Sequence, residues 1–194
     1  MREIIDGLHV GDQADFEDIE RKGHLPCWYV VHACKEPHHR NLLGYKGKGA
    51  PKEDPEYLVA RRGKRLYLNM VDLPKAEHFE DILFVAAMLH IEAGLAKKAP
   101  VLIHCNKGES RAPTLALIYL LASEGSGIFM RLFRDDFDNG IDYFKVAYPE
   151  YKPGKGMLAK LKLLVASDPQ YLRPSRLSVT PAPAAACGDL HKSP

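Results

Sequence analysis

The sequence lacks the features that mark membrane, secreted and nucleic-acid-binding proteins. No run of 18 apolar residues occurs in the 194 residues, so we expect no membrane-spanning helix. Four cysteines are too few for a disulfide framework in a chain of this length, and the first six residues carry acidic side chains where a signal peptide needs an apolar stretch. An excess of one charge is also missing, because 27 Lys or Arg nearly balance 25 Asp or Glu to give a net charge of +2. We therefore expect a cytoplasmic protein that binds neither a membrane nor a nucleic acid.

The composition that is present is typical of one globular domain. Apolar residues make up 46% of the chain and charged residues 27%, and the length favours a single domain with a sizeable core. We assign residues 1–168 to this domain. Within it, a variable loop at about residues 35–65 is rich in glycine, proline and basic residues, and is interpreted as solvated or as a surface that meets an anionic substrate. Residues 169–194 are rich in proline and alanine, and we expect a disordered tail there.

Strand and helix patterns alternate along the predicted domain. Runs of β-branched and aromatic residues predict strands at 4–10, 27–33, 66–71 and 101–104. Segments with apolar residues at helical spacing, or apolar all round, predict helices at 76–95, 111–122, 126–135, 139–147 and 155–166. This alternation predicts an α/β fold with a central, largely parallel sheet flanked by helices.

The segment from Val101 to Thr114 carries the strongest chemical signal. A short apolar strand runs into His104 and Cys105, five residues follow, and Arg111 begins the buried helix. A tight loop between a strand and a helix N-terminus turns backbone N–H groups toward one point, where the helix dipole adds positive charge. A cysteine at the head of such a loop should favour the thiolate form, which is the nucleophile. Arg111 can bind two phosphoryl oxygens at once, so the segment predicts a phosphate site with its own nucleophile.

This His-Cys-x5-Arg spacing, with glycine at the third x, resembles the signature of the cysteine-dependent protein tyrosine phosphatase superfamily. The Glu-Ser-Arg end and the short chain resemble its small, atypical dual-specificity branch, and the resemblance covers about residues 4–165. It implies a protein tyrosine phosphatase-like fold, a phosphocysteine intermediate formed on Cys105, and a supporting role for His104. It also implies a phosphate-binding loop made of Asn106, Lys107, Gly108, Glu109 and Ser110.

Cleavage of a phosphate ester also needs an acid that protonates the departing oxygen. Asp72 follows a predicted strand and lies 33 residues before Cys105 (105 − 72 = 33). The acid of dual-specificity phosphatases lies a similar distance upstream at the same place in the fold, and this resemblance makes Asp72 our candidate. A helix-capping or solvated aspartate is the alternative interpretation. The remaining candidate acids are Asp54, Glu77 and Asp81.

Two positions depart from the family pattern. The residue after the arginine is usually Ser or Thr, whose hydroxyl stabilises the thiolate that leaves the phosphocysteine, but here it is Ala112. Ser110 and Thr114 lie nearby in the sequence, and the rate of the second step depends on whether one of them replaces that hydroxyl. An Asn that supports the loop often precedes the closing helix, and Gly154 stands there instead.

We expect no cofactor and no metal ion. One cluster has passable zinc-ligand spacing, but no second ligand pair with a defined spacing accompanies it; its members are His32, Cys34, His38 and His39. Some members of the superfamily protect an oxidised catalytic cysteine with a disulfide, which Cys27 or Cys34 could form here. Buried, inert thiols are the alternative interpretation of these two cysteines.

The sequence therefore predicts a metal-independent phosphatase that hydrolyses phosphotyrosine in proteins, with phosphoserine and phosphothreonine left open as further substrates. The alternative substrates are a phosphoinositide, an RNA 5′-phosphate or a carbohydrate phosphate, and Glu109 beside Lys107 disfavours the inositol lipids. A weakly active module that binds phosphorylated partners is favoured only by Ala112. A rhodanese-like sulfurtransferase shares a cysteine loop but has no need of the upstream acid. The oligomeric state is left open.

Overall fold

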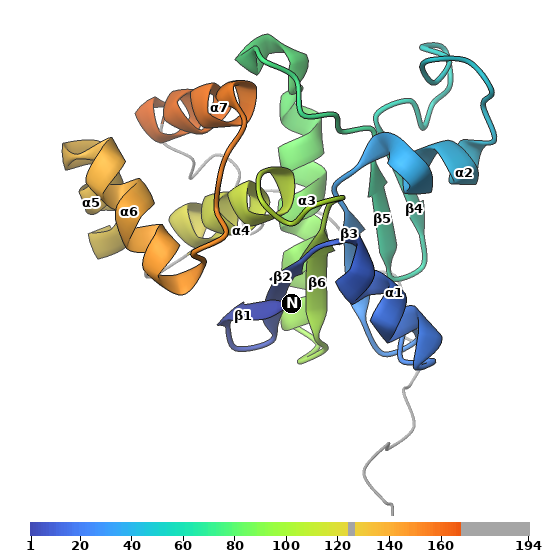
Figure 1. Cartoon of the computed structure of the whole chain (residues 1–194), viewed down its shortest axis with the longest axis horizontal. Helices are drawn as coiled ribbons and strands as arrows, with labels where there is room; N and C mark the ends of the chain where they lie inside the picture. Colours follow the sequence, from blue (N-terminus) through green and yellow to red (C-terminus); the bar gives the residue numbers. More distant parts are fainter. Residues whose placement is uncertain (124–126, 168–194) are drawn as a thin grey trace, which may run out of the picture.

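The computed structural model describes residues 1–123 and 127–167. These residues form a six-stranded sheet with the strand order β1-β2-β6-β3-β5-β4. The strands are β1 (Arg2–Ile5), β2 (Leu8–Gly11), β3 (Tyr29–His32), β4 (Val59–Arg62), β5 (Arg65–Leu68) and β6 (Val101–His104). The four inner strands are parallel, while β1 and β4 at the edges run antiparallel to their neighbours. The predicted α/β fold with a largely parallel central sheet is confirmed (Figure 1).

The helices that were predicted from the sequence are present. The helical elements are α1 (Gln13–Arg21), η1 (Lys35–His39), α2 (Arg40–Leu43), η2 (Ala76–His78), α3 (Asp81–Leu95), α4 (Arg111–Ala122), α5 (Gly127–Asp135), α6 (Phe137–Ala147) and α7 (Lys155–Ala166). The predicted helix at 76–95 is divided, because extended backbone at Phe79 and Glu80 separates η2 from α3.

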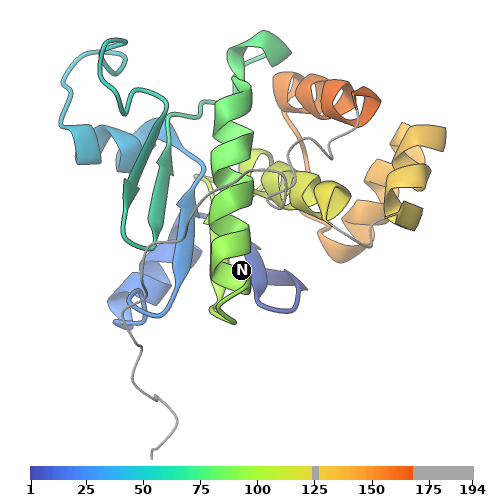
Figure 2. The same cartoon turned by 180° about the vertical axis from the view of Figure 1, so that it is seen from behind.

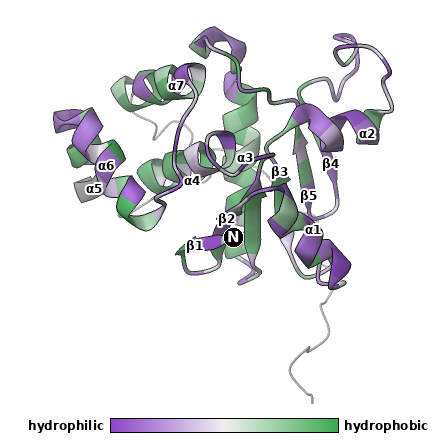
Figure 3. Ribbon diagram, in the orientation of Figure 1, coloured by the Kyte–Doolittle hydropathy of each residue, from purple (hydrophilic) through white to green (hydrophobic). Residues whose placement is uncertain are grey.

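Helices cover both faces of the sheet, so the inner strands are apolar on both sides. On one face, α1 packs against Val30 and Leu102, while α3 and α4 on the other face belong to the same core cluster as Val31 and Ile103. Figure 1 shows α1 in front of the sheet, and Figure 2, from behind, shows α3 crossing the opposite face. Apolar residues gather on the inner strands and on α3 and α4 (Figure 3). Because β3, β5 and β6 are parallel, their carboxyl ends lie together at one end of the sheet.

Three expectations about the first half of the chain were wrong or incomplete. The single strand expected at 4–10 is a hairpin, because the chain turns at Gly7, whose φ of +77° suits a residue without a side chain. The loop expected at about 35–65 contains η1, α2 and β4, and β4 pairs with β5. Helix α1 was not anticipated, although Asp12 and Asp15 form a capping box at its start.

The Pro- and Ala-rich segment 169–194, for which a disordered tail was expected, lies outside the described residues. Among the residues that the structure describes, no helix is both long and apolar enough to cross a membrane.

Candidate active site

The loop from Cys105 to Ser110 connects β6 to α4, as the sequence pattern predicted. Cys105 follows the last residue of β6 and is 2% exposed. It lines a pocket of about 410 Å³ at the carboxyl end of β6. The other residues that line the pocket are Asp72, Asn106, Lys107, Glu109, Ser110, Arg111, Lys152 and Gly154. The structure thus brings Cys105, Arg111 and Asp72 to one pocket.

Arg111 is held at the wall of this pocket by two hydrogen bonds. Its Nη1 donates to the carbonyl oxygen of Met70 at 2.9 Å, and its Nη2 donates to Oδ1 of Asn106 at 2.7 Å. Asn106 in turn donates to the carbonyl oxygen of Glu36 at 2.8 Å, so the loop is tied to η1. The Nε of Arg111 is buried and has no hydrogen-bond partner among the described residues. A buried guanidinium N–H without a partner is costly, and an anion in the pocket would satisfy it.

Gly108 lets the loop pass close to the end of β2. Its φ is +69°, and a Cβ atom there would lie 3.1 Å from the backbone of Gly11 and 3.2 Å from Oη of Tyr148. Tyr148 donates its hydroxyl to the carbonyl oxygen of Gly108 at 3.0 Å. Burial raises the pKa of Tyr148, so its hydroxyl stays a donor at neutral pH. The glycine and the tyrosine together hold the middle of the loop, and the role of Tyr148 was not foreseen from the sequence.

Gly154 supports the end of the loop although it carries no side chain. Its backbone N–H donates to Oγ of Ser110 at 2.9 Å. A Cβ atom on residue 154 would collide with the carboxylate of Asp72. The backbone N–H of residue 154 therefore supports the loop, as the family resemblance expected of an Asn side chain, and the missing side chain leaves room for Asp72 at the pocket.

Asp72 is exposed in the pocket, whereas the other candidate acids do not line it. Asp54 accepts a hydrogen bond from the backbone N–H of Glu56, and Asp81 pairs with Lys160. Glu77, on η2, forms an ion pair with Lys75, which precedes this helix. The structure brings Asp72 alone among the four acids to the same pocket as Cys105.

Ala112 is completely buried and places no hydroxyl beside Cys105. Thr114 donates its hydroxyl to the carbonyl oxygen of Ser110 at 2.7 Å and contacts Oη of Tyr151 at 3.0 Å, so its hydrogen is already in use. Ser110 lines the pocket and accepts from Gly154, which leaves its own hydroxyl hydrogen to donate. Of Ser110 and Thr114, only Ser110 lines the same pocket as Cys105.

His104 lies behind Cys105 and is fully buried. Its Nε2 is 2.7 Å from Nδ1 of His32, which ends the neighbouring strand β3. Burial lowers the pKa of His104 well below its usual value, and the charges of His38 and Arg111 lower it further. The imidazole is therefore neutral, and its contact with His32 fixes the ring at the start of the loop.

Cys34 lies at the same edge of the sheet and is fully buried. Burial raises the pKa of its thiol to about 12, although the charge of Arg111 acts in the opposite direction. Cys27 is half-buried, and neither residue is in a disulfide. Cys34 is therefore a buried thiol, and its proposed redox role remains a prediction.

The architecture is shared with solved phosphatase structures. A structure of DUSP15 superposes with a TM-score of 0.60 at 19% identity, covering 90% of this chain and 93% of that chain. The Yvh1 phosphatase domain from Chaetomium thermophilum has a TM-score of 0.55 at 19% identity and covers 84% of this chain and 92% of its own. The human tyrosine phosphatase-like serine/threonine/tyrosine-interacting protein has a TM-score of 0.54 at 18% identity, covering 86% of this chain and 96% of that chain. The fold is that of the dual-specificity phosphatases. No protein-family model and no curated protein sequence matches the chain.

Proposed function

We propose that this protein is a cysteine-dependent phosphatase that hydrolyses phosphotyrosine, and also phosphoserine and phosphothreonine, in proteins. The observation that carries the proposal is the shared pocket of Cys105, Arg111 and Asp72, together with the unpaired Nε of Arg111. A nucleophile, a phosphate ligand and an acid are the three groups that metal-independent cleavage of a phosphate ester requires.

In the first step, the thiolate of Cys105 attacks phosphorus, the S–P bond forms and the bond from phosphorus to the ester oxygen breaks. The carboxylic acid of Asp72 gives its proton to that oxygen as it leaves. Of the guanidinium groups of Arg111, Nε has no partner among the described residues and Nη2 is bonded to the side chain of Asn106. They can bind two phosphoryl oxygens, while the loop amides and the N-terminus of α4 bind the rest of the charge.

In the second step, water attacks the phosphocysteine and the carboxylate of Asp72 accepts the proton. The S–P bond breaks, inorganic phosphate is released and the thiolate of Cys105 is restored. The departing thiolate needs a hydrogen bond, and Ser110 is the group in the pocket whose hydroxyl can donate one in place of the family's residue at Ala112. The side chains that both steps require therefore line one pocket.

The rim of the pocket supports a protein substrate better than an inositol lipid. Lys107 and Lys152 contribute positive charge to the lining, but Glu109 lies among them with a negative one. Glu109 offsets part of the positive charge that a headgroup with several phosphates would require, whereas one phosphorylated side chain requires Arg111 and the amides of the loop. A module that binds phosphorylated partners without turnover would need neither the acid Asp72 nor the buried thiol of Cys105.

The experiment that tests the proposal is a hydrolysis assay with EDTA present. It compares phosphopeptides that carry phosphotyrosine, phosphoserine or phosphothreonine with inositol phosphates, 5′-phosphorylated RNA and an aryl phosphate. We expect turnover of the aryl phosphate and the phosphopeptides, inhibition by vanadate, and no turnover by Cys105→Ser. Binding of phosphopeptides without turnover would favour the binding module instead, and dependence on an added divalent ion would contradict the mechanism.

A further inference from the structure

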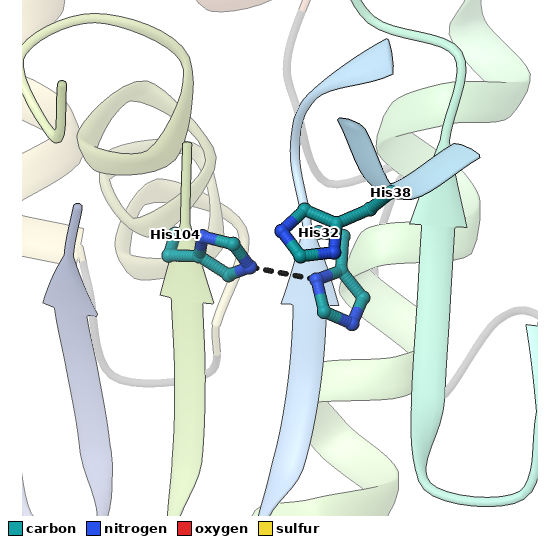
Figure 4. A group of neighbouring side chains, drawn as sticks. All are labelled: His32, His38 and His104. Carbon is teal, nitrogen blue, oxygen red and sulfur yellow. Dashed lines mark hydrogen bonds between the residues drawn. The ribbon is translucent and has the colours of Figure 1, made fainter. Parts of the chain in front are cut away.

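Three histidines from distant parts of the sequence lie together beside the phosphate loop (Figure 4). The parallel register of β3 and β6 places His32 opposite His104, each at the end of its strand. His38 comes from η1 and lies over His32, with ring centroids 4.1 Å apart. One ring nitrogen from each of the three lies within 4.8 Å of the others.

The surroundings of this His32/His38/His104 cluster hold the rings in place. Phe16 of α1 stacks on His104 at a centroid distance of 4.8 Å, and Tyr67 of β5 stacks on His32 at 4.5 Å. His32 is 1% exposed and His104 is fully buried, whereas His38 is half-buried. Two imidazoles are thus fixed inside the fold, and the third lies between them and solvent.

One hydrogen bond within the cluster marks the two nitrogens that face each other. Nδ1 of His32 and Nε2 of His104 share this bond of 2.7 Å, in which one of the two nitrogens carries the proton. An ion bound to both nitrogens would replace this bond and leave the N–H protons on the outer nitrogens of the two rings. These outer nitrogens, Nε2 of His32 and Nδ1 of His104, are buried without a hydrogen-bond partner among the described residues.

We propose that His32, His38 and His104 form a binding site for one divalent transition-metal ion of the Zn²⁺ class. Imidazole ligands suit zinc and its neighbours, and three histidines with a fourth position open to water are an established tetrahedral ligand set. With zinc–nitrogen distances of about 2.0–2.1 Å, the nitrogens of a tetrahedral site lie about 3.3 Å apart. Binding therefore requires His32 and His104 to separate slightly from 2.7 Å and His38 to move inward.

His38 is the ligand able to make that movement, because it is half-buried and lies on the short η1 segment. Its Nε2 lies 2.8 Å from Oε1 of Gln13, a partner that orients the ring at the mouth of the cluster. The site differs from the one that the sequence spacing suggested. His39 lies 3.0 Å from the carbonyl oxygen of Glu56 through its Nε2, and neither His39 nor Cys34 belongs to the cluster.

The experiment uses the full chain without a histidine tag, stripped with EDTA and dialysed. It is carried out with Cys105→Ser as the parent protein, so that the thiol of the phosphate loop cannot bind the ion and phosphatase activity plays no part in the readout. Zn²⁺ is titrated by calorimetry, and Co²⁺ is titrated by its visible absorption, which reports tetrahedral nitrogen ligation.

The decisive variant is His38→Phe, which keeps a ring stacked on His32 but removes the ligand atom. We expect one ion per chain in the parent, a rise in Tm with Zn²⁺, and at least about 10-fold weaker binding in His38→Phe. The matched control is His78→Phe, an exposed histidine of η2, which should bind as the parent does. Equal binding by His38→Phe and the parent, or the absence of a Co²⁺ spectrum, would overturn the proposal and leave the three histidines with a role in packing alone.

Discussion

The carboxylate of Asp72 occupies the space that a side chain on Gly154 would need. The same glycine donates its backbone N–H to Ser110 at 2.9 Å, so one residue fixes the acid's surroundings and the end of the phosphate loop. The two segments are separated by more than 80 residues of sequence, and both the proposed acid and the proposed nucleophile line the same pocket.

The first prediction concerns this contact. Gly154→Ala should push the Asp72 carboxylate aside and lower kcat by up to about 100-fold on substrates with poor leaving groups, because a displacement of about 1 Å is enough for such a loss. The matched control is Gly49→Ala, since an added Cβ at Gly49 meets nothing within 4 Å. Steady-state kinetics with phenyl and alkyl phosphates measure the effect. A Gly154→Ala enzyme with unchanged kcat would show that the position of Asp72 does not matter.

The second prediction tests the acid itself. Asp72→Asn should lower kcat by about two to four powers of ten on poor leaving groups and much less on acidic ones, which need no proton as they depart. Glu77→Gln, which changes an exposed acid on η2, should have little effect. Adding Gly154→Ala to Asp72→Asn should cost nothing further, because both changes remove the same proton donor. Equal losses of Asp72→Asn on every leaving group would falsify the assignment.

The third prediction separates the two buried thiols. Iodoacetate should modify Cys105 and inactivate the enzyme, with inorganic phosphate protecting it, because the pocket opens onto this thiol. Cys34 should remain unmodified, since it is fully buried and burial raises the pKa of its thiol to about 12. Peptide mapping by mass spectrometry after timed alkylation gives both rates. Modification of Cys34 at the rate of Cys105 would be inconsistent with this assignment.

The sequence predicted the loop between β6 and α4 because its members are contiguous. Strand, loop and helix follow one another from Val101 to Ala122, and the turn at Gly108 is visible as a glycine in the pattern. The position of Asp72 in the pocket could be expected from the strand before it and from the family resemblance, while its role as the acid stays a prediction. The edge of the sheet was harder to predict. β4 reads Val-Ala-Arg-Arg with two exposed residues, a pattern too short and too polar to separate from a loop.

Contacts between distant segments could not be predicted. Tyr148 reaches Gly108 across 40 residues, and nothing in the sequence around Tyr148 indicates that its hydroxyl supports the loop. The histidine cluster has the same character. His32 and His38 are near each other in the sequence, but His104 joins them only through the parallel register of β3 and β6. Strand order is a property of the whole fold, so the ligand set depends on information that local patterns do not contain.

The fourth prediction concerns the stability of the fold at acidic pH. Burial lowers the pKa of His90 to about 4, so this ring is neutral in the fold but takes up a proton in the unfolded chain below about pH 6.5. The free energy of unfolding should therefore fall as the pH falls from about 6.5 toward 4, by at most about 1.4 kcal/mol per pH unit from this one group. Urea unfolding in EDTA at several pH values measures the slope. His90→Gln should make the slope smaller, while the other buried histidines keep their share of it, and an equal slope in both proteins would contradict this account of His90.

The last prediction joins Ser110 to Ala112. If the hydroxyl of Ser110 stabilises the thiolate that leaves the phosphocysteine, Ser110→Ala should slow the second step, and rapid-quench kinetics on an activated aryl phosphate should show a burst larger than in the wild type. Ala112→Ser supplies the hydroxyl at the usual position of the family, so it should restore turnover in the Ser110→Ala background. Because Ser110→Ala also removes the acceptor of the Gly154 N–H, this rescue distinguishes lost chemistry from a disturbed loop. Ser167→Ala, an exposed serine after α7, is the control for the loss of a hydroxyl. If Ser110→Ala instead loses both the burst and the turnover, and Ala112→Ser does not restore them, then Ser110 only supports the loop.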